Sequence, residues 1–217
     1  MINAALIQES LPHLLRGSLI TLQIAFCAGI IGLLGGTLLG FIQTGHKSFW
    51  QLLANIYVTV IRGIPMLIQI SFMFFLLPYI GINLPAIYIA IIAIGLNSCA
   101  YISQVIRSGI QSVSKGQIEA ARVLGLSTHQ INRYIIFPQA IRSVLPAIGN
   151  EFITLTKDSS LASTIGVMEL FKEGRLIIMG TYDPISIYVA IGLLYLLMTT
   201  TLSCAVDYIE RKMNIHA

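Results

Sequence analysis

The stretch that decides the fold of this chain is Glu119-Ala120-Ala121-Arg122-Val123-Leu124-Gly125, which continues to Ile135-Ile136-Phe137-Pro138. It is the longest polar, charge-bearing interruption in an otherwise apolar sequence. The stretches 17–45 and 63–106 carry no charged side chain, and each exceeds the roughly 20 residues that cross a bilayer core. The sequence therefore predicts a polar segment held at a membrane surface by spanning helices.

The composition of the chain excludes a soluble globular protein. Of 217 residues, 56% are hydrophobic and 10% are charged, and the mean hydropathy is +0.83. Soluble domains have about 45–50% apolar and about 25% charged residues. The net charge of +4 does not by itself indicate a nucleic-acid partner. Its distribution along the chain is more informative, because Lys and Arg accumulate in cytoplasmic loops of membrane proteins.

The polar segment itself predicts two short helices separated by a turn. Serine followed by glutamine three residues later, at Ser114 and again at Ser127, is the spacing of a capping box at a helix start. Gly125 suits the left-handed backbone conformation that often ends a helix, here the first one. Pro138 is expected to mark the end of the second helix. Helical spacing puts Ile118, Ala121 and either Leu124 or Val123 on one face, with Lys115, Glu119 and Arg122 toward the other.

The spacing within this segment resembles a known motif. Glu-Ala-Ala, three residues, Gly, nine residues, Ile, one residue, an apolar residue and Pro is similar to the EAA loop of ABC-transporter permease subunits. The general motif has Leu where this chain has Phe137. This variant of the motif resembles the one in polar amino acid uptake permeases of histidine, arginine and glutamine type. Gly17-Ser18-Leu19, Arg62-Gly63-Ile64-Pro65 and Lys157-Asp158-Ser159-Ser160-Leu161 also look like that subfamily. The resemblance extends over nearly the whole chain.

The resemblance implies an all-α, integral membrane permease in the bacterial inner membrane, with residues 1–217 forming one domain. Its coupling residues to an ATPase would be Glu119, Ala120, Ala121 and Gly125. It further implies two ATP-binding subunits, a second permease subunit, identical or similar, an external solute-binding protein and an amino acid substrate. The sequence has no GxxxxGK[ST] phosphate loop, so ATP and Mg²⁺ are expected on the partner ATPase and no cofactor on this chain.

Five membrane spans are predicted, at about 17–42, 65–79, 84–106, 139–156 and 185–207, with the cytoplasmic loop at about 108–138. With the loop after the third span in the cytoplasm, five spans put the N-terminus outside and the C-terminus inside. We expect the first span to serve as its own insertion signal. Eight basic residues would then be cytoplasmic: Lys47, Arg107, Lys115, Arg122, Arg133, Arg142, Arg211 and Lys212. Four would be external: Arg16, Lys157, Lys172 and Arg175.

Two details of the spans bear on packing. Glycines recur at near-helical spacing in the first span, which predicts close approach of another helix: Gly29, Gly32, Gly35, Gly36 and Gly40. Before the second span, Arg62 is interpreted as a side chain that reaches lipid headgroups.

The candidate substrate-binding residues are Asn97, Glu151 and Asp158. Polar groups in a membrane span are costly and indicate a functional or paired environment. Glu151 and Asp158 are seven residues apart and share a face if the helix continues that far. Two carboxylates at a cavity favour a cationic side chain, as in arginine, lysine or histidine. The alternatives are an interhelical hydrogen bond for Asn97, internal pairing of Glu151 with Arg142 or Lys157, and a glutamine or other polar substrate.

Other classes of protein fit the sequence less well. A DNA-binding helix–turn–helix is disfavoured, because the second short helix offers only His129 and Arg133 as contacts and membrane spans flank it. An ion-coupled transporter or channel would have no use for the loop. An enzyme is disfavoured by the lack of HExxH and GxSxG motifs. We therefore expect neither catalytic residues nor a metal site on this chain.

Overall fold

The structure is a computed structural model that describes residues 2–45 and 48–212. Lys47, one of the basic residues predicted to be cytoplasmic, lies outside the described residues. All regular structure in the described part is helical, as predicted. The helices are α1 (Ala4–Thr44), α2 (Phe49–Gly63), α3 (Met66–Tyr79), α4 (Ala86–Gln111), α5 (Lys115–Val123), α6 (Thr128–Ile131), a π-helical segment (Asn132–Ile136), α7 (Phe137–Asp158), a 3₁₀ segment (Ser159–Ile165), α8 (Leu170–Thr181) and α9 (Pro184–Lys212).

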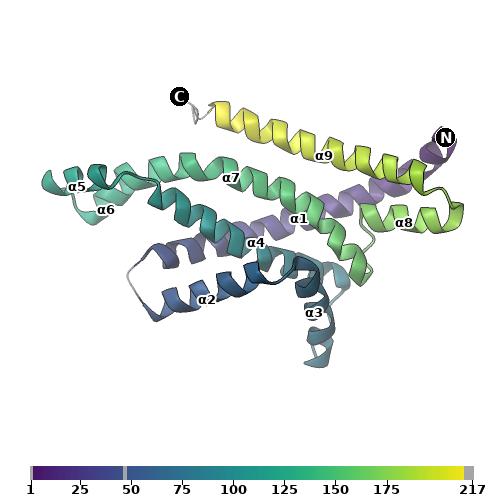
Figure 1. The fold of residues 1–217 in the computed structure, drawn as a ribbon, viewed down its shortest axis with the longest axis horizontal. Helices are drawn as coiled ribbons and strands as arrows, with labels where there is room; N and C mark the ends of the chain where they lie inside the picture. Colours follow the sequence, from purple (N-terminus) through teal and green to yellow (C-terminus); the bar gives the residue numbers. More distant parts are fainter. Residues whose placement is uncertain (1, 46–47, 213–217) are drawn as a thin grey trace.

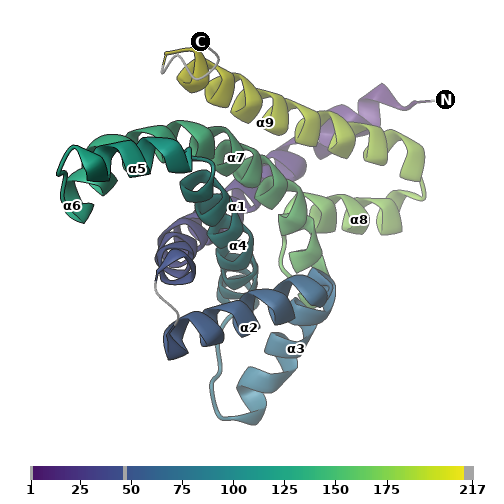
Figure 2. The ribbon, with the colours of Figure 1, turned by 60° about the vertical axis from the view of Figure 1, so that its left-hand side comes forward.

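Four long helices, α1, α4, α7 and α9, run along the long axis of the molecule, as Figure 1 shows. The polar segment, α5 and α6, lies at one end, and α8 and the N-terminus lie at the other. Helix α3 projects away from this bundle (Figures 1 and 2). The core forms where α1, α4 and the end of α7 meet, with Ile24, Ala28, Ile94 and Leu155 almost fully buried.

The glycines of α1 form the surface on which α4 packs. A Cβ atom added at Gly36 would lie 2.7 Å from Cβ of Ile102 and 2.9 Å from the carbonyl oxygen of Cys99. One at Gly40 would lie 2.7 Å from Cβ of Ile106. The predicted close approach is confirmed, because only hydrogen at these positions leaves room for α4.

Three helices in the described residues, α1, α4 and α9, are long and apolar enough to cross a bilayer. Helices α2 and α3 meet that condition together and are bent by 105° at the break between them. Helix α7, which carries Arg142, Glu151, Lys157 and Asp158, is not among the helices that meet it. Each predicted span corresponds to a helix, α1 being longer at its start, but the count of five spans and the orientation stay predictions.

The outer surface of the bundle is apolar, as a lipid-facing surface requires. On α1, Leu19, Phe26, Leu34 and Leu38 are between 62% and 69% exposed and recur at helical spacing. Only 11% of the most apolar part of α9 is buried. Water would solvate such a surface poorly, so these helices are built to face lipid.

The start of α7 differs from the prediction. Pro138 does not limit the second short helix: it lies in the first turn of α7, and the chain is helical from α6 onward. A proline is accommodated there because it has no N–H to donate and directly follows the π-helical turn, where the regular α-helical hydrogen-bond pattern is already interrupted. The junction is a π-helical turn, closed by the N–H of Phe137 donating to the carbonyl of Asn132. The polar segment is therefore joined to α7 by continuous helix.

Of the two predicted capping boxes, one is confirmed. The N–H of Gln130 donates to Ser127 Oγ at 3.3 Å, and Gln130 Oε1 accepts from the Ser127 N–H at 2.8 Å. The prediction for Ser114 is wrong, since its side chain makes no capping hydrogen bond. Its expected partner Gln117 is used elsewhere, because Gln117 Oε1 accepts from Gln139 Nε2 at 2.8 Å.

Sequence analysis missed one buried carboxylate, Glu169, which precedes α8. It accepts hydrogen bonds from the backbone N–H groups of Phe171 (2.9 Å) and Lys172 (2.8 Å), and from the Tyr195 hydroxyl of α9 (3.0 Å). A carboxylate in this position satisfies free N–H groups and stabilises the positive end of the helix. The signal was its place directly before an apolar helical run.

A short chain of hydrogen bonds joins the starts of α1 and α9. The N–H of Asn3 donates to Ser186 Oγ at 2.8 Å, and that hydroxyl donates to Asp183 Oδ2 at 2.7 Å. The hydroxyl and backbone N–H of Ser186 together lower the pKa of Asp183. The first helix is thereby fixed beside the last one.

The packing of α1 on α4 predicts that Gly36→Ala destabilises the protein by about 1–3 kcal/mol, the usual cost of overpacking. The added methyl group would meet Ile102 and the α4 backbone, so the helices must separate. The measurement is denaturant unfolding of the purified protein in detergent. Gly192→Ala is the matched control, because nothing lies within 4 Å of its added Cβ. Equal stability of the two variants would contradict this account of the interface.

Candidate functional site

A pocket of about 400 Å³ brings together all three predicted substrate-binding residues, Asn97, Glu151 and Asp158. They come from two helices, α4 and α7, and the break between α2 and α3 forms the opposite wall. The lining residues are Arg62, Gly63, Ile64, Pro65, Met66, Asn97, Tyr101, Glu151, Thr154 and Asp158. We call this pocket the acidic cavity.

Helix α7 supplies the acidic side of this cavity. It continues to Asp158, so the condition for a shared face is met, and Thr154 lies on the same face between the two carboxylates. Both carboxylates are half-buried. Because a buried charge is costly without a partner, a cavity lined by two of them favours a cationic group.

Glu151 is held by a serine from the neighbouring helix. Ser98 of α4 is fully buried, and its hydroxyl donates to Glu151 Oε1 at 2.9 Å. The alternative was that Glu151 pairs with Arg142 or Lys157. In the structure Glu151 is hydrogen-bonded to Ser98 instead. Gly32 of α1 contacts Ser98 so closely that an added Cβ would collide with the hydroxyl oxygen. The glycine surface of α1 therefore positions the hydroxyl that holds this carboxylate.

Asn97 both lines the cavity and joins two helices. Its Nδ2 donates to Gln69 Oε1 of α3 at 3.2 Å, which is the interhelical hydrogen bond considered as an alternative. Gln69 in turn donates to the carbonyls of Ile61 (2.8 Å) and Ile64 (2.7 Å), where α2 ends. Asn97 therefore connects α4 to the bend between α2 and α3 and still faces the acidic cavity.

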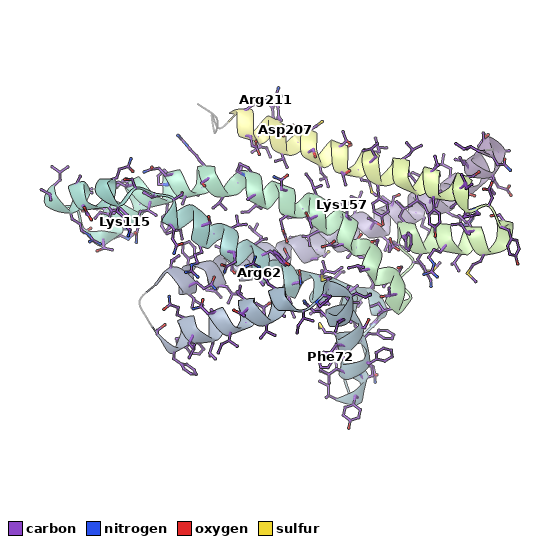
Figure 3. All side chains as sticks on the ribbon, viewed as in Figure 1. Arg62, Phe72, Lys115, Lys157, Asp207 and Arg211 are labelled. Carbon is purple, nitrogen blue, oxygen red and sulfur yellow. The ribbon has the colours of Figure 1, made fainter. Side chains whose placement is uncertain are left out.

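Arg62 also lines the acidic cavity, which sequence analysis did not predict. Its guanidinium lies over the Tyr101 ring, 5.3 Å from the ring centroid, and it lines the acidic cavity. Figure 3 shows it between the α2–α3 pair and the long helices. The cavity thus contains one cation beside two carboxylates. Helices α2 and α3 bend by 105° at the break that contains Pro65, and the contact of Arg62 with lipid headgroups stays a prediction.

The polar segment forms the second part of the candidate site. Glu119, Ala120 and Gly125 are exposed and Ala121 is buried, so α5 rests on its Ala121 side. Gly125 has φ +80°, the left-handed conformation predicted for it. The N–H of Leu126 donates to the carbonyl of Ala121 at 3.1 Å, which closes the helix end.

The tip of α5 departs from the predicted apolar face. Val123 is 87% exposed and Leu124 is 79% exposed, although helical spacing put one of them inside. Both therefore project from the end of the molecule together with the exposed Glu119. Two apolar side chains exposed at a helix end are the kind of surface that fits a groove on a partner protein.

The comparisons with known proteins agree with this geometry. Residues 32–215 match the family described as binding-protein-dependent transport system inner membrane component. The glutamine transport system permease protein GlnP of Escherichia coli (strain K12) is 36% identical over 215 residues, covering 96% of each chain. The putative glutamine transport system permease protein GlnP of Rickettsia conorii (strain ATCC VR-613 / Malish 7) is 36% identical over 204 residues and 94% of each chain.

A solved structure described as an amino acid ABC transporter with histidines superposes with a TM-score of 0.92 at 36% identity, covering 98% of this chain and 99% of the other. An all-helical bundle with an apolar outer surface, a charged cavity and a protruding polar loop defines a membrane transport subunit. The chain belongs to the family of binding-protein-dependent transport system inner membrane components, the permease subunits of ABC transporters. In this family the ATPase activity lies in partner subunits.

The bond between Ser98 and Glu151 predicts coupling between the two positions. Ser98→Ala and Glu151→Ala each remove one partner of a hydrogen bond to a charged group, which contributes about 1.5–3 kcal/mol. In a double-mutant cycle on the free energy of unfolding in detergent, we expect a coupling energy of that size. Additive effects, within about 0.5 kcal/mol, would show that the hydrogen bond contributes nothing.

Proposed function

We propose that this chain forms the translocation pathway of an ATP-driven importer for a polar, preferably basic, amino acid in the inner membrane of a bacterial cell. The observation that carries the proposal is the acidic cavity, with Glu151, Asp158 and Arg62 around one space of about 400 Å³. Every amino acid carries an ammonium and a carboxylate, and this cavity offers an opposite charge to each.

The preference for a basic amino acid follows from the count of charges in the cavity. One carboxylate is sufficient for the α-ammonium group, so the second is available to a cationic side chain. The solved relative with histidines supports a substrate of this class. Glutamine is the second candidate, since the relatives from Escherichia coli and Rickettsia conorii are named as glutamine permeases, and Asn97 and Thr154 can hydrogen-bond a side-chain amide.

The remaining assembly follows from the polar segment, α5 and α6, which we call the coupling loop. Two ATP-binding subunits would hold ATP and Mg²⁺, and a second permease, identical or similar, would complete the membrane part. An external binding protein would deliver the substrate on the α8 side. Docking of Glu119, Ala120 and the exposed Val123 and Leu124 into each ATPase would transmit its closure through the continuous helix into α7, which carries Glu151 and Asp158. No nucleic acid takes part.

Substrate charge is tested by Glu151→Gln in the transporter reconstituted with its ATPase and binding protein. Loss of one charge pair is expected to lower uptake of L-arginine by about tenfold, equivalent to 1.4 kcal/mol, and uptake of L-glutamine much less. Asp207→Asn, which changes an exposed carboxylate of α9 labelled in Figure 3, serves as the control. Equal losses for both substrates would refute the charge argument.

The role of the coupling loop is tested by Glu119→Lys. The exposed carboxylate would be reversed without any change in packing, so the chain should insert normally while ATP hydrolysis no longer drives uptake. Measuring ATPase activity and uptake on the same proteoliposomes checks this expectation. Glu9→Lys, at the opposite end of the molecule, should leave the ratio of the two unchanged. A Glu119→Lys chain that fails to insert would show that the loop is only structural.

A further inference from the structure

A second polar pocket, of about 500 Å³, lies beside the acidic cavity. Arg62, Gly63 and Tyr101 line both pockets, so the cation–π contact between Arg62 and Tyr101 stands where they meet. The residues that line the second pocket are Gln43, Asn55, Val58, Thr59, Arg62, Gly63, Tyr101, Gln104 and Arg107. We call it the amide pocket.

One face of α4 passes through both pockets in order. Asn97 lines the acidic cavity, Tyr101 lines both, and Gln104 and Arg107 line the amide pocket. Steps of three or four residues keep them on one side of the helix. From Asn97 to Arg107 the helix rises about 15 Å, toward the end that carries α5 and α6. The amide pocket therefore lies on the coupling-loop side of the acidic cavity.

The amide pocket is built around a buried glutamine. Gln43, at the end of α1, is 3% exposed. Its Nε2 donates to Asn55 Oδ1 at 2.9 Å, and its Oε1 accepts from Gln104 Nε2 at 2.9 Å. The side chain of Gln51 donates to the Gln43 carbonyl at 2.9 Å. These bonds connect α1, α2 and α4 and fix the orientation of the amides.

The groups left over in this pocket are mostly hydrogen-bond donors. Asn55 retains its amide N–H groups, because its oxygen is the atom already used. The guanidinium groups of Arg62 and Arg107 donate no hydrogen bond within the described residues, and none of the described lining residues is acidic. Two cations, an amide and the Thr59 hydroxyl, without a carboxylate, match an anionic ligand. The acidic cavity has the opposite balance.

We propose that the amide pocket is a second amino-acid site, which takes the α-carboxylate of the substrate through Arg107 as the molecule leaves the acidic cavity. The proposal rests on the proposed transport function. Arg62 lines both pockets, so it can stay near the substrate's carboxylate during the transfer. The substrate's carboxylate passes from the acidic cavity, which holds two carboxylate side chains, to the amide pocket, which holds mostly hydrogen-bond donors. Arg107 is a binding residue of this second site and makes no contact in the first.

The test is equilibrium binding of radiolabelled L-arginine, and of L-glutamine in parallel, to the detergent-solubilised complex of permease and ATPase without nucleotide. The wild type is expected to bind two molecules per permease chain. Arg107→Gln should retain the site that depends on Glu151 and lose the other, and Glu151→Gln should do the reverse. Arg142→Gln, which lies in neither pocket, is the matched control. Retention of one site in Arg107→Gln also shows that the variant is folded.

Recognition of the carboxylate itself is tested with agmatine, which is arginine without its carboxylate. Agmatine should fail to compete with L-arginine at the Arg107-dependent site. Arg107→Lys keeps the positive charge and should therefore bind L-arginine at this site, unlike Arg107→Gln. Agmatine should compete at the site in Arg107→Lys no better than in the wild type. A single site in the wild type, removed by Glu151→Gln, would overturn the second site and leave the transport function standing. Absence of any Glu151-dependent binding would instead overturn the proposed function.

Discussion

The close contact between α4 and the glycine surface of α1 is the constraint on which the rest of the structure depends. Gly32, Gly36 and Gly40 admit α4 at a distance that any larger side chain would prevent. The same contact fixes Ser98, whose hydroxyl holds Glu151 of α7. Packing on one face of α4 therefore sets the geometry of the cavity on another face, so that a change in helix spacing would reach the carboxylates.

The polarity of α7 is explained by what it faces. A helix with Arg142, Glu151, Lys157 and Asp158 would be costly in lipid, but its acidic face lines a cavity and one carboxylate has a hydrogen bond from a buried serine. A hydrogen bond compensates only part of the cost of burying a charge. A cationic ligand would supply the rest, in agreement with the proposed preference for a basic amino acid. The continuous helix from α6 through the π-helical turn joins this face to the coupling loop.

The fold was largely predictable, because its signals are local: the uncharged runs, the glycine spacing, the left-handed Gly125 and the capping box at Ser127. The shared face of Glu151 and Asp158 followed from helical periodicity alone. The contact of Arg62 with Tyr101 and its place in the cavity could not be predicted, because both depend on the bend between α2 and α3, which is a tertiary property. The prediction for Pro138 was wrong because the chain stays helical through the π-helical turn into α7. The prediction for Ser114 was wrong because its expected partner Gln117 is hydrogen-bonded to Gln139 of α7. The polar face of α4, Asn97, Tyr101, Gln104 and Arg107, was present in the sequence as a helical repeat, but its meaning depends on which helices surround it.

The most direct test of the central claim, that this chain is a substrate pathway driven from outside itself, is uptake into proteoliposomes with the partner subunits added in turn. We expect ATP-dependent amino acid uptake to require this chain, its ATPase and the binding protein together, and an ion gradient not to replace ATP. Uptake by this chain without the ATPase, driven by an ion gradient, would contradict it.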